Sequence, residues 1–136
     1  MDDTIRRLNM SMIAFDAALG AGALLAPNQT LWILGHDRPS EDARHLFRRC
    51  GPIWLTFAAA HAVAATRGAP EDWWALAWLR ATELMTDVVW SQSPAVSRPG
   101  AKLGLKLAGV ANLAMSAAFA ATARTAASGL RADTQR

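Results

Sequence analysis

The chain has 136 residues, of which 52% are hydrophobic and 18% are charged, and its formal net charge is +3. This hydrophobic content excludes intrinsic disorder, which requires low hydrophobicity and high charge. The basic residues lie at the ends of apolar segments and form no continuous stripe, which argues against binding to nucleic acid. Basic residues at both ends of an apolar run are typical of helices that meet lipid headgroups.

The first predicted helix runs from about residue 4 to residue 26, where Pro27 stops it. The chain has no charged residue between Asp16 and His36. Small residues recur at every fourth position of this helix, which predicts one smooth face that another helix can approach closely. These residues are Ala14, Ala18, Gly22 and Ala26.

A short interfacial helical turn follows at residues 31–35 and places Trp32 at the depth of the lipid headgroups. Ser40 is the predicted N-cap of the second long helix, because acidic residues occupy the first turn after it. This helix runs to about Thr66, and its apolar part is interrupted only by His61.

The third long helix, residues 71–91, differs from the others because Arg80, Glu83 and Asp87 lie inside it. The fourth runs over residues 101–127 and is uncharged through most of its length. It also has a small, partly polar stripe at a spacing of four residues. The stripe consists of Gly104, Ala108, Asn112, Ser116 and Ala120.

These segments predict an all-α fold, a four-helix transmembrane bundle with a short interfacial helix after the first span. An apolar helix of roughly 17–25 residues crosses a bilayer. The whole chain, residues 1–136, is then a single multi-pass domain of the cell membrane with both termini on one side. A soluble Ala-rich bundle is the alternative, but it would have polar residues along one side of every helix. The spans are predicted at about residues 8–26, 47–67, 72–91 and 103–124.

Three ionisable residues, Arg80, Glu83 and Asp87, share one face of the third helix because they are three and four positions apart. A charge that faces hydrocarbon costs about 2.5–3.5 kcal/mol. We therefore expect this face to point into the bundle. One guanidinium cannot neutralise both carboxylates, so we expect one of them to pair with Arg80 and the other to hold its proton. The candidate neighbours from other helices are Asp16, His61, Asn112 and Ser116.

A protonated acid beside a histidine can exchange a proton near neutral pH. Glu83, Asp87 and His61 are therefore the candidate acid/base residues, with Arg80 as their charge partner. A buried polar network can also fix helix register without any chemistry, and that alternative stays open. The candidate substrate contacts are Asp16, Trp90, Asn112 and Ser116.

One histidine and two carboxylates, His61, Glu83 and Asp87, resemble a set of metal ligands. The chain lacks the Glu-x-x-His pair and the second nearby histidine of helical-bundle metal centres, so no metal is expected. The single cysteine, Cys50, excludes an internal disulfide. No nucleophile motif and no phosphate-binding glycine loop is present. We expect no cofactor.

Three segments resemble the DoxX-like group of small bacterial four-helix membrane proteins. They are GALLAP at residues 22–27, LWILG at residues 31–35 and RRCG at residues 48–51. The similarity covers most of residues 10–90. It implies a four-helix fold in the bacterial inner membrane and, as for a few members, association with quinone-linked oxidoreductases. Quinone-site residues cannot be matched one by one, so no such role is carried over.

Two interpretations of function follow. In the first, the protein is a membrane subunit or carrier whose interior cluster handles a proton or a small lipophilic molecule. In the second, it is a cofactor-free membrane enzyme of the isomerase, cyclase or epoxide hydrolase type, with carboxylates as acid and base. A cavity between the helices would favour a carrier or an enzyme, and a packed interior a structural subunit. The expected partners are the lipid bilayer, a small lipophilic ligand, and another membrane protein or a second copy of the chain.

Overall fold

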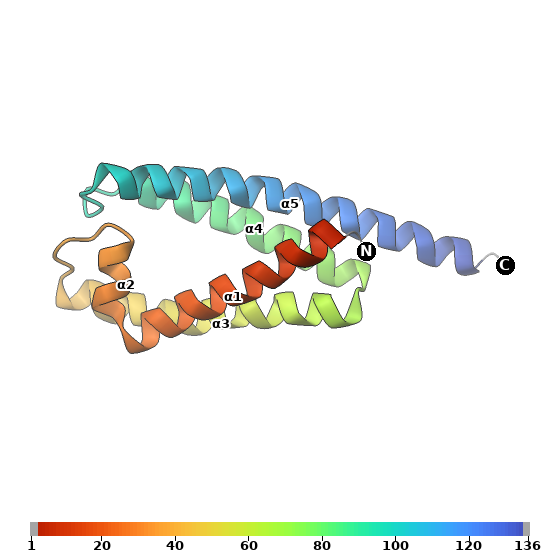
Figure 1. Ribbon diagram of the computed structural model, residues 1–136, viewed down its shortest axis with the longest axis horizontal. Helices are drawn as coiled ribbons and strands as arrows, with labels where there is room; N and C mark the ends of the chain where they lie inside the picture. Colours follow the sequence, from red (N-terminus) through yellow and green to blue (C-terminus); the bar gives the residue numbers. More distant parts are fainter. Residues whose placement is uncertain (1–2, 135–136) are drawn as a thin grey trace.

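The computed structural model describes residues 3–134, and every element in this part of the chain is an α-helix (Figure 1). The predicted all-α class is confirmed. Most helix ends lie within two residues of their predicted positions, except that the short helix starts earlier and the last helix is longer. The helices are α1 (Asp3–Leu25), α2 (Pro27–Ile33), α3 (Glu41–Arg67), α4 (Pro70–Ser91) and α5 (Pro99–Thr134).

Proline, serine and glycine residues set the helix ends. Pro27 follows the end of α1 and opens α2. The Ser40 hydroxyl caps α3 by accepting a hydrogen bond from the Ala43 backbone N–H at 3.2 Å. Gly68 ends α3 with a φ of 64°, a left-handed conformation that glycine adopts without strain. Pro70 then occupies the first turn of α4, where its missing N–H costs nothing.

The long helices associate as two antiparallel pairs, α1 with α3 and α4 with α5 (Figure 1). Contact between the pairs is sparser and runs mainly through α3 and α4. The two helices of the first pair come close together at Gly20 and Gly51, where a Cβ on Gly20 would lie 2.9 Å from the Gly51 carbonyl oxygen. The first pair is therefore held at a distance that only glycine permits at this crossing.

The buried face of α1 is not the predicted one. Ala14 and Ala18 are exposed, so the prediction that they form the packing face is wrong. Two polar residues of α1 find partners only inside the molecule, and their burial sets the rotation of the helix. The buried residues are Asn9, Met12, Asp16, Gly20 and Ala23.

Two apolar clusters lie on either side of a layer of buried ionisable residues. The first contains Trp73, Leu76 and Phe119 at the end that holds the start of α1. The second contains Leu31 and Phe47, among others, beneath α2. Along α1, α3 and α4 the buried ionisable residues come between the residues of these two clusters.

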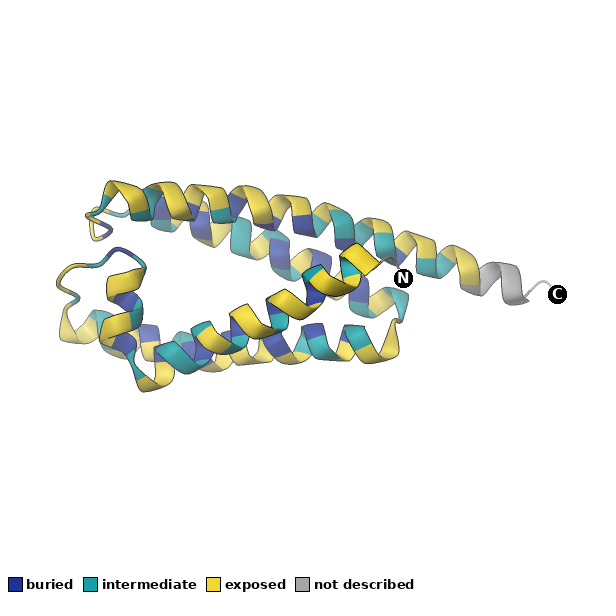
Figure 2. Ribbon diagram, in the orientation of Figure 1, coloured by how far each residue is buried: buried dark blue, intermediate teal, exposed yellow. Residues whose placement is uncertain are grey.

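Large apolar side chains are exposed along all four long helices (Figure 2). Phe15 is 56% exposed, Trp78 is 72% exposed and Val110 is 65% exposed. Two helices, α1 and residues 99–129 of α5, are long and apolar enough to cross a membrane. In each of them, 28% of the most apolar stretch is buried inside the molecule. Among the described residues, α3 and α4 do not meet the same criterion.

Candidate functional site

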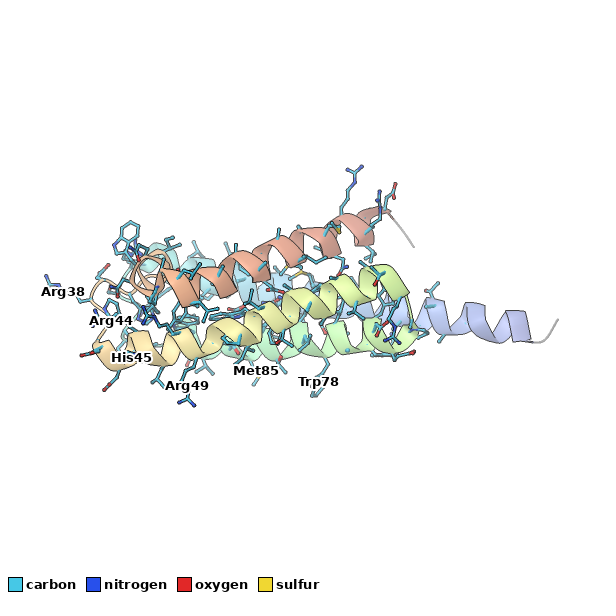
Figure 3. The ribbon with its side chains drawn as sticks, turned by 90° about the horizontal axis from the view of Figure 1, so that it is seen from below. Arg38, Arg44, His45, Arg49, Trp78 and Met85 are labelled. Atoms are coloured by element: carbon cyan, nitrogen blue, oxygen red, sulfur yellow. The ribbon has the colours of Figure 1, made fainter. Side chains whose placement is uncertain are left out.

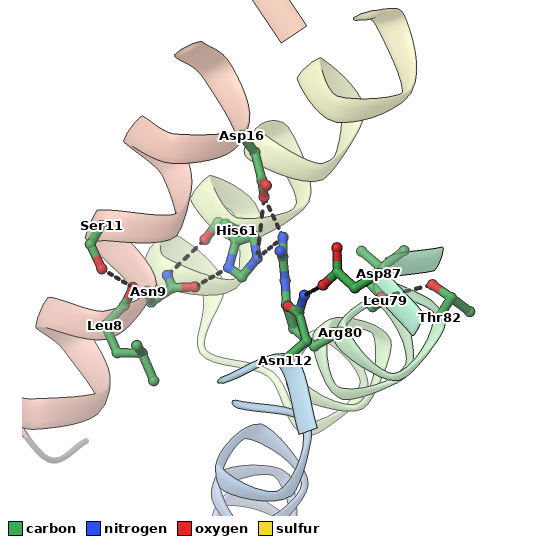
Figure 4. A network of polar contacts seen from close by, with 10 residues as sticks. All are labelled: Leu8, Asn9, Ser11, Asp16, His61, Leu79, Arg80, Thr82, Asp87 and Asn112. Atoms are coloured by element: carbon green, nitrogen blue, oxygen red, sulfur yellow. Dashed lines mark hydrogen bonds and ion pairs between the residues drawn. The ribbon is translucent and has the colours of Figure 1, made fainter. Parts of the chain in front are cut away.

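A buried network of polar side chains joins α1, α3 and α4 (Figure 4). Arg80 forms a hydrogen-bonded ion pair with Asp16 through its Nη2 and the Asp16 Oδ2. The same Nη2 lies 2.9 Å from the His61 Nε2. All three side chains are at most 1% exposed. A buried charge needs a partner at hydrogen-bonding distance, and this cluster supplies one across the helix interface.

The hydrogen bonds of His61 to Arg80 and Asn9 fix which ring nitrogen carries the proton. A guanidinium can only donate, so the His61 Nε2 accepts from Arg80. The ring then carries its proton on Nδ1, which donates to the Asn9 Oδ1 at 2.5 Å, while the Asn9 Nδ2 donates to the His61 carbonyl oxygen at 2.9 Å. His61 is therefore neutral, and the charges of Asp16 and Arg80 balance each other. Asn9 was not among the predicted residues, although it shares a stripe with Met12 and Asp16 at helical spacing.

The prediction that Arg80 pairs with Glu83 or Asp87 is wrong, because its partner is Asp16. Asp87 is seven residues from Arg80 and projects from nearly the same side of α4. At the level of Arg80 the neighbouring helices are α1 and α3, whereas at the level of Asp87 the neighbour is α5. The Asp87 Oδ2 therefore accepts a hydrogen bond from the Asn112 Nδ2 at 2.8 Å.

A cleft of about 780 Å³ lies between the two helix pairs. Its walls are mainly apolar and come from all five helices, with Phe15, Leu19 and Leu105 among the apolar residues. Its volume is in the range of about 300–1,000 Å³ that holds small ligands. Phe15 and Ala111 line the cleft and are also exposed, so the cleft opens to the surroundings between α1 and α5.

Two carboxylates, Glu83 and Asp87, line the cleft one helical turn apart. Neither has an ion-pair partner within 4.0 Å among residues 3–129, whose side chains the structure describes. Trp54 lines the cleft together with Glu83. Asn112 is 7% exposed, and its Oδ1 has no hydrogen-bond partner among the described residues. The cleft is thus lined by two carboxyl groups without a cation and by a residue with an unused acceptor.

The structure divides the predicted site residues into two groups. One group lines the cleft, and within it Trp90 also donates from its indole to the His36 Nε2 at 2.8 Å. The other group is not among the lining residues of the described chain, and Ser116 in it donates to the Ala77 carbonyl oxygen at 2.8 Å. Lining the cleft are Arg80, Glu83, Asp87, Trp90 and Asn112, and outside it are Asp16, His61 and Ser116.

Among the side chains that the structure describes, residues 3–129, no three His, Cys, Asp or Glu groups are placed to hold a metal ion. The set of His61, Glu83 and Asp87 is not assembled, since His61 belongs to the buried network and the carboxylates face the cleft. Comparison with protein-family models, curated proteins and solved structures finds no match for this chain.

Proposed function

We propose that the protein is a multi-pass membrane protein whose four long helices each cross the bilayer. In this proposal it binds a small lipophilic molecule in the cleft between its two helix pairs. The observation that carries the proposal is the cleft, because it combines apolar walls with a few converging polar groups. In the carrier interpretation drawn from the sequence, Glu83, Asp87 and Asn112 form the polar part of the binding site.

The distribution of charge supports a bilayer environment. Figure 3 shows Arg38, Arg44, His45 and Arg49 gathered at one end of the molecule. Away from the two ends, in residues 8–25, 50–66, 73–91 and 107–123, every ionisable side chain is buried or half-buried. Hydrocarbon imposes this arrangement, because each lipid-facing charge would cost several kcal/mol. The inward residues are Asp16, Cys50, His61, Arg80, Glu83 and Asp87.

The polar helix α4 can span the bilayer only if its charges turn inward. Arg80 and Asp87 are buried and Glu83 is half-buried. The opposite side of α4 carries Trp78 and Met85, which are 72% and 66% exposed and project outward in Figure 3. This helix therefore has an apolar outer surface despite its three internal charges.

The opening of the cleft suits a ligand that arrives from the lipid. It lies between α1 and α5, the two helices that are long and apolar enough to cross a membrane. A lipophilic molecule dissolved in the acyl chains would enter the cleft sideways, between α1 and α5.

An acid/base enzyme would use the same cleft, but its predicted histidine partner, His61, lies outside it. Binding alone accounts for the geometry. Membership of the DoxX-like group and quinone-linked partners remain predictions.

Photolabelling tests the proposal. Membranes that contain the full chain are irradiated with an alkanol bearing a diazirine, and the label is mapped by peptide mass spectrometry. We expect label on Met12–Leu19 and on Gly104–Met115, reduced by Ala108→Trp, which fills the cleft. Ala114→Trp is the matched control, because Ala114 is exposed on the same helix and does not line the cleft. Equal labelling of both variants and the parent would contradict ligand binding in the cleft.

A further inference from the structure

We infer that the ligand of the cleft is a lipophilic amine, whose ammonium group lies among Glu83, Asp87 and Asn112 and whose apolar body fills the rest of the cleft. The inference rests on the proposed function, because it names the class of ligand for the same site. Three independent features of the cleft support it: its charge balance, its unused acceptor and its aromatic lining.

The ion pairs of the interior leave two carboxyl groups of the cleft without a cation. The two cations that line the cleft are each in an ion pair, Arg80 with Asp16 and Arg98 with Asp37 at 3.5 Å, although the Arg80 Nε and the Arg98 Nε and Nη2 make no hydrogen bond among the described residues. His61 is neutral and lies outside the cleft. Glu83 and Asp87 therefore have no cation of their own among the described residues, and a ligand that brings one positive charge offsets part of their surplus.

Asn112 favours a ligand that carries a hydrogen-bond donor. Its Nδ2 is committed to the Asp87 Oδ2, which fixes the orientation of the amide. Its Oδ1 is then a buried acceptor without a donor among the described residues, in a side chain that lines the cleft. A buried acceptor is satisfied only by an N–H or O–H group. A carboxylate or a ketone would leave the Asn112 Oδ1 unsatisfied, whereas a primary ammonium supplies three donors.

Aromatic rings complete the environment of a cation. Phe15, Trp54 and Trp90 all line the cleft. The faces of such rings attract ammonium groups, and their apolar surface packs against hydrocarbon. An amine therefore meets carboxylates, an amide oxygen and aromatic faces in one place.

The test compares three probes that differ only in their polar group. They are 4-phenylbutylamine, 4-phenylbutan-1-ol and 4-phenylbutyrate, titrated calorimetrically at pH 7.5 into the full chain in detergent. We expect the amine to bind at least about tenfold more tightly than the alcohol, and the anion not to bind. In Glu83→Gln/Asp87→Asn the ratio of amine to alcohol affinity should fall to about one. Each single variant should lower the ratio part of the way, so the result does not depend on the double variant alone.

The matched control is Glu41→Gln/Asp42→Asn, which removes the same charge from exposed residues at the start of α3 and should keep the full preference. Equal affinities for amine and alcohol, both abolished by Ala108→Trp, would overturn the inference and leave the proposed function standing. Binding that survives Ala108→Trp, or no binding of any probe, would overturn both.

Discussion

The buried network and the cleft contain the same kinds of side chain in two different situations. In the network, the groups of Asp16, His61 and Arg80 are paired across helices and the charges cancel. In the cleft, Glu83 and Asp87 face open volume without a cation. The comparison teaches that a buried ionisable residue indicates a ligand site only when no opposite charge within the protein is paired with it. Where such a pair exists, the residue holds helices together, even though the Asp16 Oδ1 and the Arg80 Nε make no hydrogen bond among the described residues.

The largest effect is expected from breaking the network. Asp16→Ala leaves Arg80 buried without its counter-ion, which typically costs about 3–5 kcal/mol. Asp87→Ala leaves only the Asn112 Nδ2 without its acceptor, at a cost of about 1–3 kcal/mol. The free energy of unfolding of both variants is measured by titration with a denaturing detergent. Equal losses would remove the distinction between network and cleft.

The second prediction concerns the packing of α1 against α3, which is tight, whereas the cleft between the two helix pairs is open. Gly20→Ala places a Cβ 2.9 Å from the Gly51 carbonyl oxygen, so the backbones must separate at a cost of about 1–3 kcal/mol. Gly104→Ala is the control, because a Cβ there meets nothing within 4 Å and Ala favours the helix. The thermal midpoint should fall in the first variant and stay or rise in the second. The reverse order would show that the α1–α3 crossing is wrong.

Smaller effects on stability are expected from the cleft carboxylates. Glu83→Gln and Asp87→Asn keep the shape of the side chains, and the new amide at position 87 can still accept from Asn112. Each should change the free energy of unfolding by less than about 1 kcal/mol. The thermal midpoint in detergent is the readout, with Asp16→Asn as the comparison. A loss in either variant as large as that of Asp16→Asn would place the cleft carboxylates in the structural network.

The smallest effect is the pH dependence of the contact between Trp90 and His36, a histidine that lies outside the proposed spans. Burial lowers the pKa of His36 below its ordinary value of 6.5, so the neutral ring is the form that the fold favours. The neutral Nε2 accepts from the Trp90 indole, and protonation removes that acceptor. The unfolded chain binds more protons, so this stabilisation is present above pH 6.5 and is lost as the pH falls through the lowered pKa.

Thermal midpoints from pH 8 to pH 5 check this dependence by comparing the parent with His36→Phe. The difference between them should shrink as the pH falls. A difference that stays constant over this range would mean that protonation of His36 does not destabilise the fold.

Much of the fold could be predicted from the sequence, because its signals are local. Ser40, Gly68 and Pro70 act on their own turns, and the observed ends of α3 and α4 lie within a residue of the prediction. The inward position of Arg80 and Asp87 followed from their spacing and from the cost of exposing charge to lipid.

The partners across helices could not be predicted in the same way. The pairing of Arg80 with Asp16 depends on how far α1 slides and rotates against α4, which spacing within one helix does not encode. The smooth stripe of α1 was assigned from small residues alone, while Asn9 and Asp16 determine which side is buried. The cleft itself arises because the pairs α1–α3 and α4–α5 pack well internally and meet sparsely, a property of the assembled chain.

The most direct test of the central claim, that apolar exteriors and a polar interior place this chain across a bilayer, is membrane partitioning of the full chain. Membranes from expressing cells are washed with alkaline carbonate and floated on a density gradient. The account predicts that the protein stays with the floated membranes after the wash. Recovery of a folded, monodisperse protein from the soluble fraction without detergent would contradict it.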